Sequence, residues 1–273
     1  VGAGELRLGL AGDLEKAIGL RGGKVQLTLT NRHGGSLGPS AGLDPLQAFI
    51  EVHGRGDRWR LTQFWYEQTL GAFALKLGRV NPGSDFDAFA CDFENLTFCG
   101  SAPGNLAGDY WFNAPVSQWG ARAKLTFGDD AGYVEAGAYE VNPRNLHDGF
   151  TLSFAGGEGA LFPVEAAWTP KLGAAGLPGT YLVGAWYSTA DADDVLLAAD
   201  GAPLPLTEAP ALRRPNSYGA YLSFEQQVSG EPDGPGVTVF LNATQTDRRT
   251  TRLDRQVAAG VAWKGALAAR PDD

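Results

Sequence analysis

The sequence alternates between apolar and polar residues in many short segments. In the segment ARAKLTF, Ala121, Leu125 and Phe127 take odd positions, while Arg122 and Lys124 take even ones. Successive side chains of a β-strand point to opposite faces, so this segment would carry one apolar and one cationic face. A soluble sheet buries its apolar face and leaves the charges in bulk water. A membrane barrel turns the apolar face to lipid and the charges to a water-filled lumen.

Eleven segments of this kind run along the chain. Most have about ten residues, the length that a tilted strand needs to cross a bilayer. Aromatic residues stand near segment ends, as they do at the interfaces of a membrane barrel, among them Tyr133, Tyr139, Trp168, Tyr181, Tyr187, Tyr218 and Trp263. We predict an all-β chain with antiparallel strands near residues 4–16, 24–33, 58–69, 71–80, 118–128, 131–142, 160–170, 178–190, 216–230, 236–246 and 254–265.

The connections between these segments alternate in length. Short ones lie near 70–71, 129–130, 171–177 and 231–235, and long ones near 34–57, 81–117, 143–159 and 191–215. Outer-membrane barrels have short periplasmic turns and long external loops, and bacterial ones have an even number of strands. The direction of the first strand and the odd strand count lead us to expect at least one strand before residue 1. With no methionine and no leader in the sequence, we also expect a processed or cut N-terminus.

Composition and motifs argue against several classes of function. The net charge of −9 disfavours nucleic acid as a partner, and no apolar run reaches the roughly 18 residues of a membrane helix. The chain has no Gly-x-Ser-x-Gly motif, and its histidines (His33, His53 and His147) form no metal-ligand pair, so we expect no enzyme activity, metal or cofactor. The acidic stretch TADADD (189–194) lacks the glycine and distal glutamate of a calcium loop. A soluble sugar-binding β-sandwich is the rival fold, because its strands would alternate too.

The only two cysteines are Cys91 and Cys99. A local disulfide suits this spacing and would indicate an oxidising compartment. Closing so short a loop stabilises a protein by about 2.5 kcal/mol in the chain-entropy model. The alternative is a pair of reduced, buried thiols.

Several stretches resemble the carbohydrate-selective porin family of the OprB type. They are QFWYEQTL (63–70), LKLGRVNPGSDFDAFACDFENLTFCG (75–100), WFNAPVSQWGARAKL (111–125), YVEAGAYEVNPR (133–144), GTYLVGAWYSTA (179–190) and VAWKGALAARPDD (261–273). The resemblance is collinear over essentially the whole chain. It implies a 16-stranded barrel in the bacterial outer membrane, in contact with lipid, through which sugars such as glucose diffuse.

On this interpretation, residues 1–273 form a single partial barrel domain with about eleven strands, open at its edges, and about four further strands follow residue 273. A closed barrel has no free edge strand, so a monomer is compatible with the fold. A general, non-selective porin stays open as the alternative function.

The alternation also assigns side chains to the lumen. Arg122 is favoured as a sugar contact because its planar fork donates two parallel hydrogen bonds, and Trp186 is a candidate for stacking on a sugar ring. Glu67 is placed inward because a charge that faces lipid costs roughly 2–4 kcal/mol at mid-depth. Arg144 belongs to a stretch that resembles the outer end of a family strand, near the pore mouth. The predicted pore-lining residues are Arg122, Lys124, Trp186, Glu135, Glu67, Lys76, Arg144 and Tyr221, with Arg32, Glu165, Glu225 and Asn242 as further inward candidates.

The connection 81–117 is predicted to form the constriction. It is long, rich in aromatic residues, and carries Asp85, Asp87, Asp92 and Glu94. A loop this apolar is disfavoured in bulk water, so we expect it to fold into the barrel. The alternative is a lid packed over the barrel rim.

Overall fold

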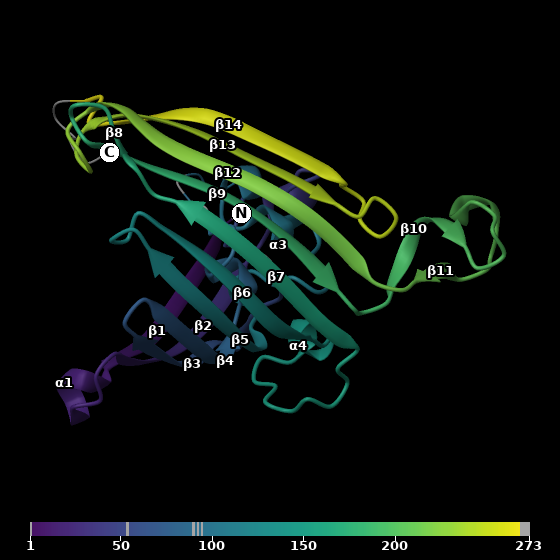
Figure 1. Ribbon diagram of the computed structural model, residues 1–273. Helices are drawn as coiled ribbons and strands as arrows, with labels where there is room; N and C mark the ends of the chain where they lie inside the picture. The colour runs from purple at the N-terminus through teal and green to yellow at the C-terminus, as the bar shows by residue number, and fades with distance from the viewer. Residues whose placement is uncertain (1, 53–54, 89–90, 92, 94, 268–273) are drawn as a thin grey trace.

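One antiparallel sheet curves around an interior occupied by part of the chain itself (Figure 1). The computed structural model describes residues 2–52, 55–88, 91, 93 and 95–267. Each main strand pairs with the next one along the chain, in the order β1-β2-β3-β4-β5-β6-β7-β9-β12-β13-β14. Among the described strands β1 and β14 form the two edges, so this part of the sheet is open.

All eleven predicted strands are present, and the predicted all-β, antiparallel fold is confirmed. Their bounds are β1 Ala3–Asp13, β2 Gly23–Gly34, β3 Arg58–Leu70, β4 Phe73–Val80, β5 Gln118–Phe127, β6 Gly132–Val141, β7 Gly159–Trp168, β9 Leu177–Ser188, β12 Ser217–Gly230, β13 Gly236–Thr246 and β14 Arg255–Lys264.

Three details differ from the prediction. The first strand ends at Asp13, because the Asp13 carboxylate accepts hydrogen bonds from Glu15 N and Lys16 N and caps helix α1 (Leu14–Ile18). The connection 191–215 is not a plain loop. It contains a hairpin of β10 (Ala192–Ala198) and β11 (Ala211–Arg214), and the shorter connection 171–177 contains β8 (Lys171–Leu172).

The two ends of the sheet carry different helices and short strands. Helix α1 and the short β8 lie at one end, while helix α4 (Arg144–His147) and the projecting β10–β11 hairpin lie at the other (Figure 1). The long connections also contain α2 Leu37–Ser40, η1 Pro82–Ser84, η2 Leu96–Phe98, α3 Ala102–Leu106 and η3 Leu204–Leu206. Within the described residues, every helix is too short or too polar to cross a bilayer.

The outer face of the sheet is apolar and exposed. Leu8, Leu125, Val134, Val164 and Val183 all point outward and are about half exposed. Their sequence neighbours point inward, because side chains alternate along each strand, and they include the polar or aromatic residues Arg7, Lys124, Tyr133, Glu135 and Glu165. The sheet therefore has the inverted sidedness that its sequence predicts, with the apolar residues outside.

We predict that a charge on this outer face destabilises the fold. Val164 lies near the middle of β7, and Val164→Arg should lower the free energy of unfolding by about 2–4 kcal/mol, the effect of Arg near a bilayer midplane. Val164→Leu keeps the face apolar and should stay within about 0.5 kcal/mol of wild type. Equilibrium unfolding in lipid vesicles measures both, and equal stabilities would contradict a lipid-facing surface.

Candidate functional site

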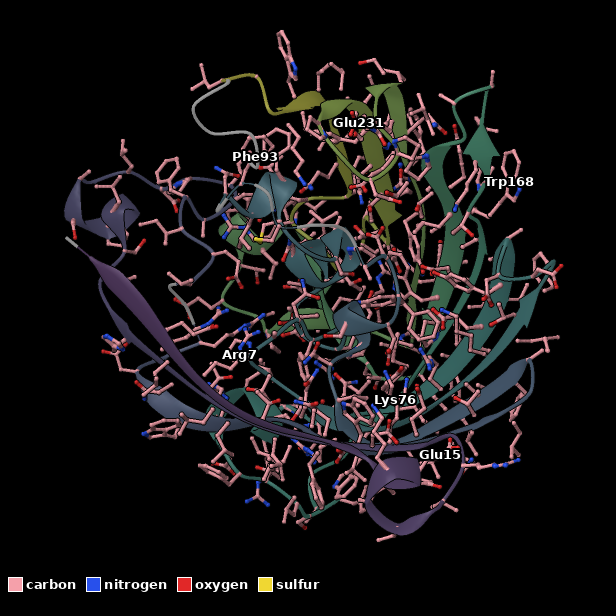
Figure 2. All side chains as sticks on the ribbon, turned by 90° about the vertical axis from the view of Figure 1, so that its left-hand side faces the viewer. Arg7, Glu15, Lys76, Phe93, Trp168 and Glu231 are labelled. Atoms are coloured by element: carbon pink, nitrogen blue, oxygen red, sulfur yellow. A yellow bond between two sulfur atoms is a disulfide. The ribbon has the colours of Figure 1, made fainter. Side chains whose placement is uncertain are left out.

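The connection between β4 and β5 (residues 81–117), which we call the inner loop, lies inside the curve of the sheet. Viewed from one end, the strands arc around its coils, with Lys76 turned toward the enclosed space and Trp168 turned away from it (Figure 2). Three side chains of the inner loop, those of Phe86, Trp111 and Phe112, have no exposed surface. The loop therefore folds into the interior, as predicted, and is not a lid over the rim.

Aromatic rings join the inner loop to the wall. Trp111 packs edge-on against Trp186 of β9 and Tyr221 of β12, with ring centroids 5.4 and 6.2 Å apart. Phe86 meets Tyr139 of β6 in the same manner at 6.1 Å. Trp186 Nε1 also donates to the Tyr110 hydroxyl at 3.0 Å. This half of the interior is a packed aromatic core.

Glycines of the strands let these rings lie flat against the wall. A Cβ at Gly184 would come within 2.3 Å of the Tyr221 hydroxyl oxygen, and one at Gly219 within 2.1 Å of the Trp186 ring. Both contacts are closer than atoms can approach, so only glycine fits beneath these rings. A glycine inside a strand often marks a place where other atoms approach the backbone closely. Gly184 and Gly219 could therefore have indicated the aromatic core from the sequence, whereas the alternation of apolar and polar residues could not.

Arg122 lies at the centre of a buried charge cluster. Its guanidinium is 2.5 Å from a Glu67 oxygen, 3.3 Å from Asp85 and 3.4 Å from Glu135. Lys76 pairs with the same Asp85 carboxylate. Because Asp85 belongs to the inner loop and the other members to strands β3 to β6, the cluster fastens the loop to the wall.

Asp87 connects the inner loop to two distant strands. Its backbone N–H donates to Glu165 Oε2 of β7 at 2.7 Å, and its carboxyl accepts from Asn242 Nδ2 of β13 at 3.1 Å and from Ala102 N at 3.1 Å. Burial raises the pKa of Asp87 to about 8, an effect that the hydrogen bonds from Asn242 and Ala102 oppose and the charge of Glu165 reinforces.

The structure places seven of the eight predicted pore-lining residues on the inner face of the strands. Lys124 lies over the Tyr133 ring at 3.4 Å from its centroid, and the Trp186 ring contacts Trp111 and Tyr221. Arg144 is the exception: it lies in α4, is half exposed, and pairs with Asp148 at 3.2 Å. A sugar contact for any of these residues stays a prediction.

Other predicted features have clear outcomes in the described residues. Cys91 and Cys99 form a disulfide, which excludes the alternative of free thiols.

In the acidic stretch 189–194, Asp193 and Asp194 pair with Arg213 and Arg214 of the facing strand at 2.9 and 2.7 Å. The described part of the chain holds no cluster of three or more side chains suited to a metal ion. His53, Asp92 and Glu94 lie outside the described residues.

A cavity remains between the inner loop, strands β1 and β2 and the β2–β3 connection. It has a volume of about 540 Å³ and is lined by arginine, carboxylate and amide side chains, among them Arg7, Arg32, Glu51, Arg55, Asn105 and Asn113. A second cavity of about 330 Å³ continues along Gln26, Thr28 and Gln63 and shares Arg7, Asn81, Ser84 and Ala114 with the first. Because they share these residues, the two cavities adjoin, and we call them together the polar passage.

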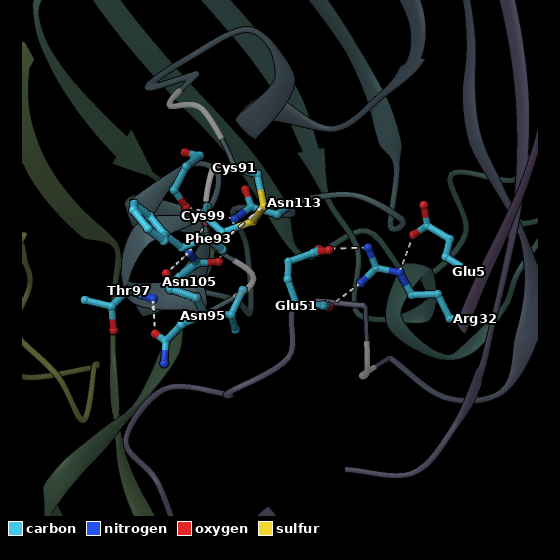
Figure 3. Close-up of a disulfide and its surroundings, with 12 residues drawn as sticks. Glu5, Arg32, Glu51, Cys91, Phe93, Asn95, Thr97, Cys99, Asn105 and Asn113 are labelled. Carbon is cyan, nitrogen blue, oxygen red and sulfur yellow. Dashed lines mark hydrogen bonds and ion pairs between the residues drawn. A yellow bond between two sulfur atoms is a disulfide. The ribbon is translucent and has the colours of Figure 1, made fainter. Parts of the chain in front are cut away.

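Arg32 is held between carboxylates at the wall of this cavity. Its Nε donates to Glu5 at 2.7 Å, and its NH2 group donates to Glu51 at 2.7 Å (Figure 3). On the opposite wall, close to the disulfide, Asn113 Nδ2 donates to Asn105 Oδ1 at 2.9 Å (Figure 3). The wall therefore presents charged donors and acceptors side by side.

Sequence reasoning missed most of this passage. Glu51 and Arg55 lie in the connection between β2 and β3, which has no alternation to assign them a direction. The alternation predicts an inward Arg32, but nothing in the sequence distinguishes it from Arg122. The two differ in their partners: Arg122 pairs with Asp85 of the inner loop, and Arg32 pairs with Glu5 of β1 and Glu51 of the β2–β3 connection.

Comparison with known proteins identifies the family. The model of the "Carbohydrate-selective porin, OprB family" matches residues 2–273. The chain belongs to the OprB family. OprB porins are outer-membrane proteins and not enzymes, which confirms the predicted localisation and the prediction of no enzyme activity.

Relatives of this OprB-family chain agree in sequence and in structure. It is 44% identical over 279 residues to "Porin B" of Pseudomonas aeruginosa, covering 98% of this chain and 61% of that protein. It is 35% identical over 285 residues to "Putative porin QuiX" of Acinetobacter baylyi, covering 99% of this chain and 62% of that protein. The high-pH structure of Pseudomonas putida OprB matches with a TM-score of 0.93 at 40% identity, over 99% of this chain and 66% of that one. The chain thus spans about three fifths of the length of the curated relatives it matches.

We predict that Arg122 stabilises the fold and does not merely line the inner face of the sheet. Arg122→Ala would remove the cation that buried Glu67, Asp85 and Glu135 share and leave them only Lys76 and Lys124, so it should lower the free energy of unfolding by about 3 kcal/mol. Lys124 is more exposed, so Lys124→Ala should lower it by about 1 kcal/mol or less. Urea unfolding in detergent micelles compares the two variants, and equal losses would contradict a structural role specific to Arg122.

The pKa of Asp87 predicts a pH dependence of loop docking. Its folded-state pKa of about 8 lies above the ordinary value of 3.8, so the docked loop holds this proton more tightly than a released loop would. Docking is therefore strongest below about pH 4 and weakens as the pH rises toward 8. Thermal unfolding scans from pH 4 to pH 9 should show stability falling more steeply in wild type than in Asp87→Asn. Parallel slopes would contradict the assignment.

Proposed function

We propose that this chain forms part of the wall and the constriction of a channel through which carbohydrates diffuse, with residues 1–273 belonging to one barrel domain. The polar passage between the inner loop and strands β1 to β3 carries the proposal. Its larger cavity, about 540 Å³, lies within the roughly 300–1,000 Å³ of sites that hold small molecules. The apolar outer face would contact lipid, and sugars would be the solutes.

The chemistry of the wall suits a neutral polyol. Every sugar hydroxyl can both donate and accept a hydrogen bond, and Arg32, Glu5 and Glu51 offer donors and acceptors next to one another. Each of these charges already has a partner, so a sugar must compete for it and would be held weakly. A channel needs binding of this strength, because the solute must also leave.

The first test is the conductance of the protein that contains this chain, measured in a planar bilayer and titrated with glucose. We expect stepwise channels whose current falls saturably as glucose rises. Arg32→Ala removes charge-assisted hydrogen bonds worth about 1.5–3 kcal/mol, so it should raise the dissociation constant for the block roughly tenfold or more. Arg255→Ala removes an exposed arginine at the start of β14 and should leave the block unchanged.

Each contrary result has a distinct meaning. Channels that ignore glucose would leave a general, non-selective porin as the function. A block that Arg32→Ala does not weaken would place the sugar route outside the cavity along β1 to β3.

A further inference from the structure

The inner loop covers much of the inner face of the sheet. On the wall of β6 to β13, Tyr139, Trp186, Tyr221, Glu165 and Asn242 are each less than 5% exposed, because the inner loop lies on them. On β2 and β3, Thr30, Arg32 and Thr62 are also 5% exposed or less, whereas the Arg7 side chain on the edge strand β1 is 53% exposed. The inner loop therefore determines how much of the interior a solute can enter, and what holds the loop in place determines the size of the passage.

At Asp87 the inner loop is bonded to two distant strands and to another part of itself. Asp87 bonds through its N–H to Glu165, and through its carboxyl to Asn242 and to Ala102 N at the start of α3. Asn242 lies 155 residues along the chain from Asp87. This single residue therefore ties the inner loop to β7 and to β13 at once.

Glu165 is itself fixed in position. Tyr221 of β12 donates to its Oε2 at 2.7 Å, and Tyr133 of β6 donates to its Oε1 at 2.7 Å. Both carboxylate oxygens are thereby oriented, and one of them faces the Asp87 N–H. The acceptor is preorganised by the barrel wall and does not depend on the loop.

The backbone at Asp87 is consistent with a residue under constraint. Its φ of 46° lies in the left-handed region, which residues other than glycine adopt only rarely. Such a conformation persists where surrounding contacts impose it. Here the contacts are the hydrogen bonds to Glu165 and Asn242 and the packing of the adjacent Phe86 against Tyr139.

We propose that Asp87, Glu165 and Asn242 form a latch that seats the inner loop on β7 and β13 and thereby sets the upper size limit of the permeating sugar. The proposal rests on the proposed function, since it assigns positioning residues to the same channel. With the latch intact, solutes are confined to the passage along β1 to β3. Without it, the loop keeps only its aromatic packing on that wall, and the interior next to β7 and β13 becomes more accessible.

The test uses the protein that contains this chain, with glucose and sucrose as probe solutes in planar bilayers and in liposome-swelling assays. Asn242→Ala and Asp87→Ala should raise the single-channel conductance roughly twofold, because current follows the open cross-section. Both variants should admit sucrose faster relative to glucose than wild type does. Single-channel recording reports only channels that have folded and inserted.

Gln227→Ala is the matched control. Gln227 is also a buried inner-face amide, but it bonds Ser229, Glu231 and Asp233 at the turn after β12. Its loss should leave the conductance and the sucrose-to-glucose ratio at their wild-type values. If Gln227→Ala widened the channel as much as Asn242→Ala, general loosening of the barrel would explain the effect and the latch would be rejected.

Asn242→Asp provides a readout that a purely structural role would not give. It would place a second carboxyl about 3 Å from Asp87, where two carboxylates cannot both be ionised at low energetic cost. The other titratable groups around this point are Glu165, Tyr221 and Tyr133 on β7, β12 and β6. The Asn242→Asp channel should therefore widen reversibly between about pH 5 and pH 8, by more than wild type does.

The outcomes separate the two proposals. If glucose blocks wild type while the Asp87 and Asn242 variants keep its conductance and size limit, and Asn242→Asp responds to pH as wild type does, the latch is wrong and the channel function stands. If glucose does not block wild type at all, the proposed carbohydrate channel fails, whatever the variants do.

Discussion

The hydrogen-bonding requirement of the backbone governs the whole structure. Inside a bilayer no water is available to backbone N–H and C=O groups, so each strand must bond to a neighbour along its length. The eleven main strands meet this requirement by pairing in chain order, each with the next. Continuous pairing then fixes the faces, because a shift of one residue would exchange lipid-facing and interior side chains. The apolar exterior and the polar or aromatic interior follow from this one constraint.

The interior raises a second problem, since a wide curved sheet leaves space that must be filled or hydrated. The inner loop fills it unevenly. Phe86 and Trp111 pack against Tyr139, Trp186 and Tyr221 on one side, whereas the side next to β1 to β3 keeps a polar cavity. The inward side chains of Tyr139, Trp186 and Tyr221 would line the interior if the loop were absent, and here they hold the loop in place.

Periodicity made the strands and their faces predictable, because period-two alternation is a local signal that survives in each segment. The close spacing of Cys91 and Cys99 likewise made their pairing predictable. The contacts of the inner loop were not predictable in this way: Asp87 and Asn242 meet across 155 residues, and no local pattern links them. Glu51 and Arg55 fall in a connection without alternation, so their place beside the cavity depends on tertiary structure alone. The β10–β11 hairpin was missed because its short strands lie within a segment rich in turn residues.

Arg122 and Arg32 show why a lumen-facing charge is not by itself a binding residue. Both stand on inward positions of neighbouring parts of the sheet, and both bond two or more carboxylates. Arg122 shares its partners with the inner loop, so its charge is committed to structure. Arg32 is equally buried, but it pairs with Glu5 and with Glu51, which lines the cavity. The partners of an inward arginine, more than the direction of its side chain, therefore distinguish one that anchors the inner loop from one that lies beside the cavity.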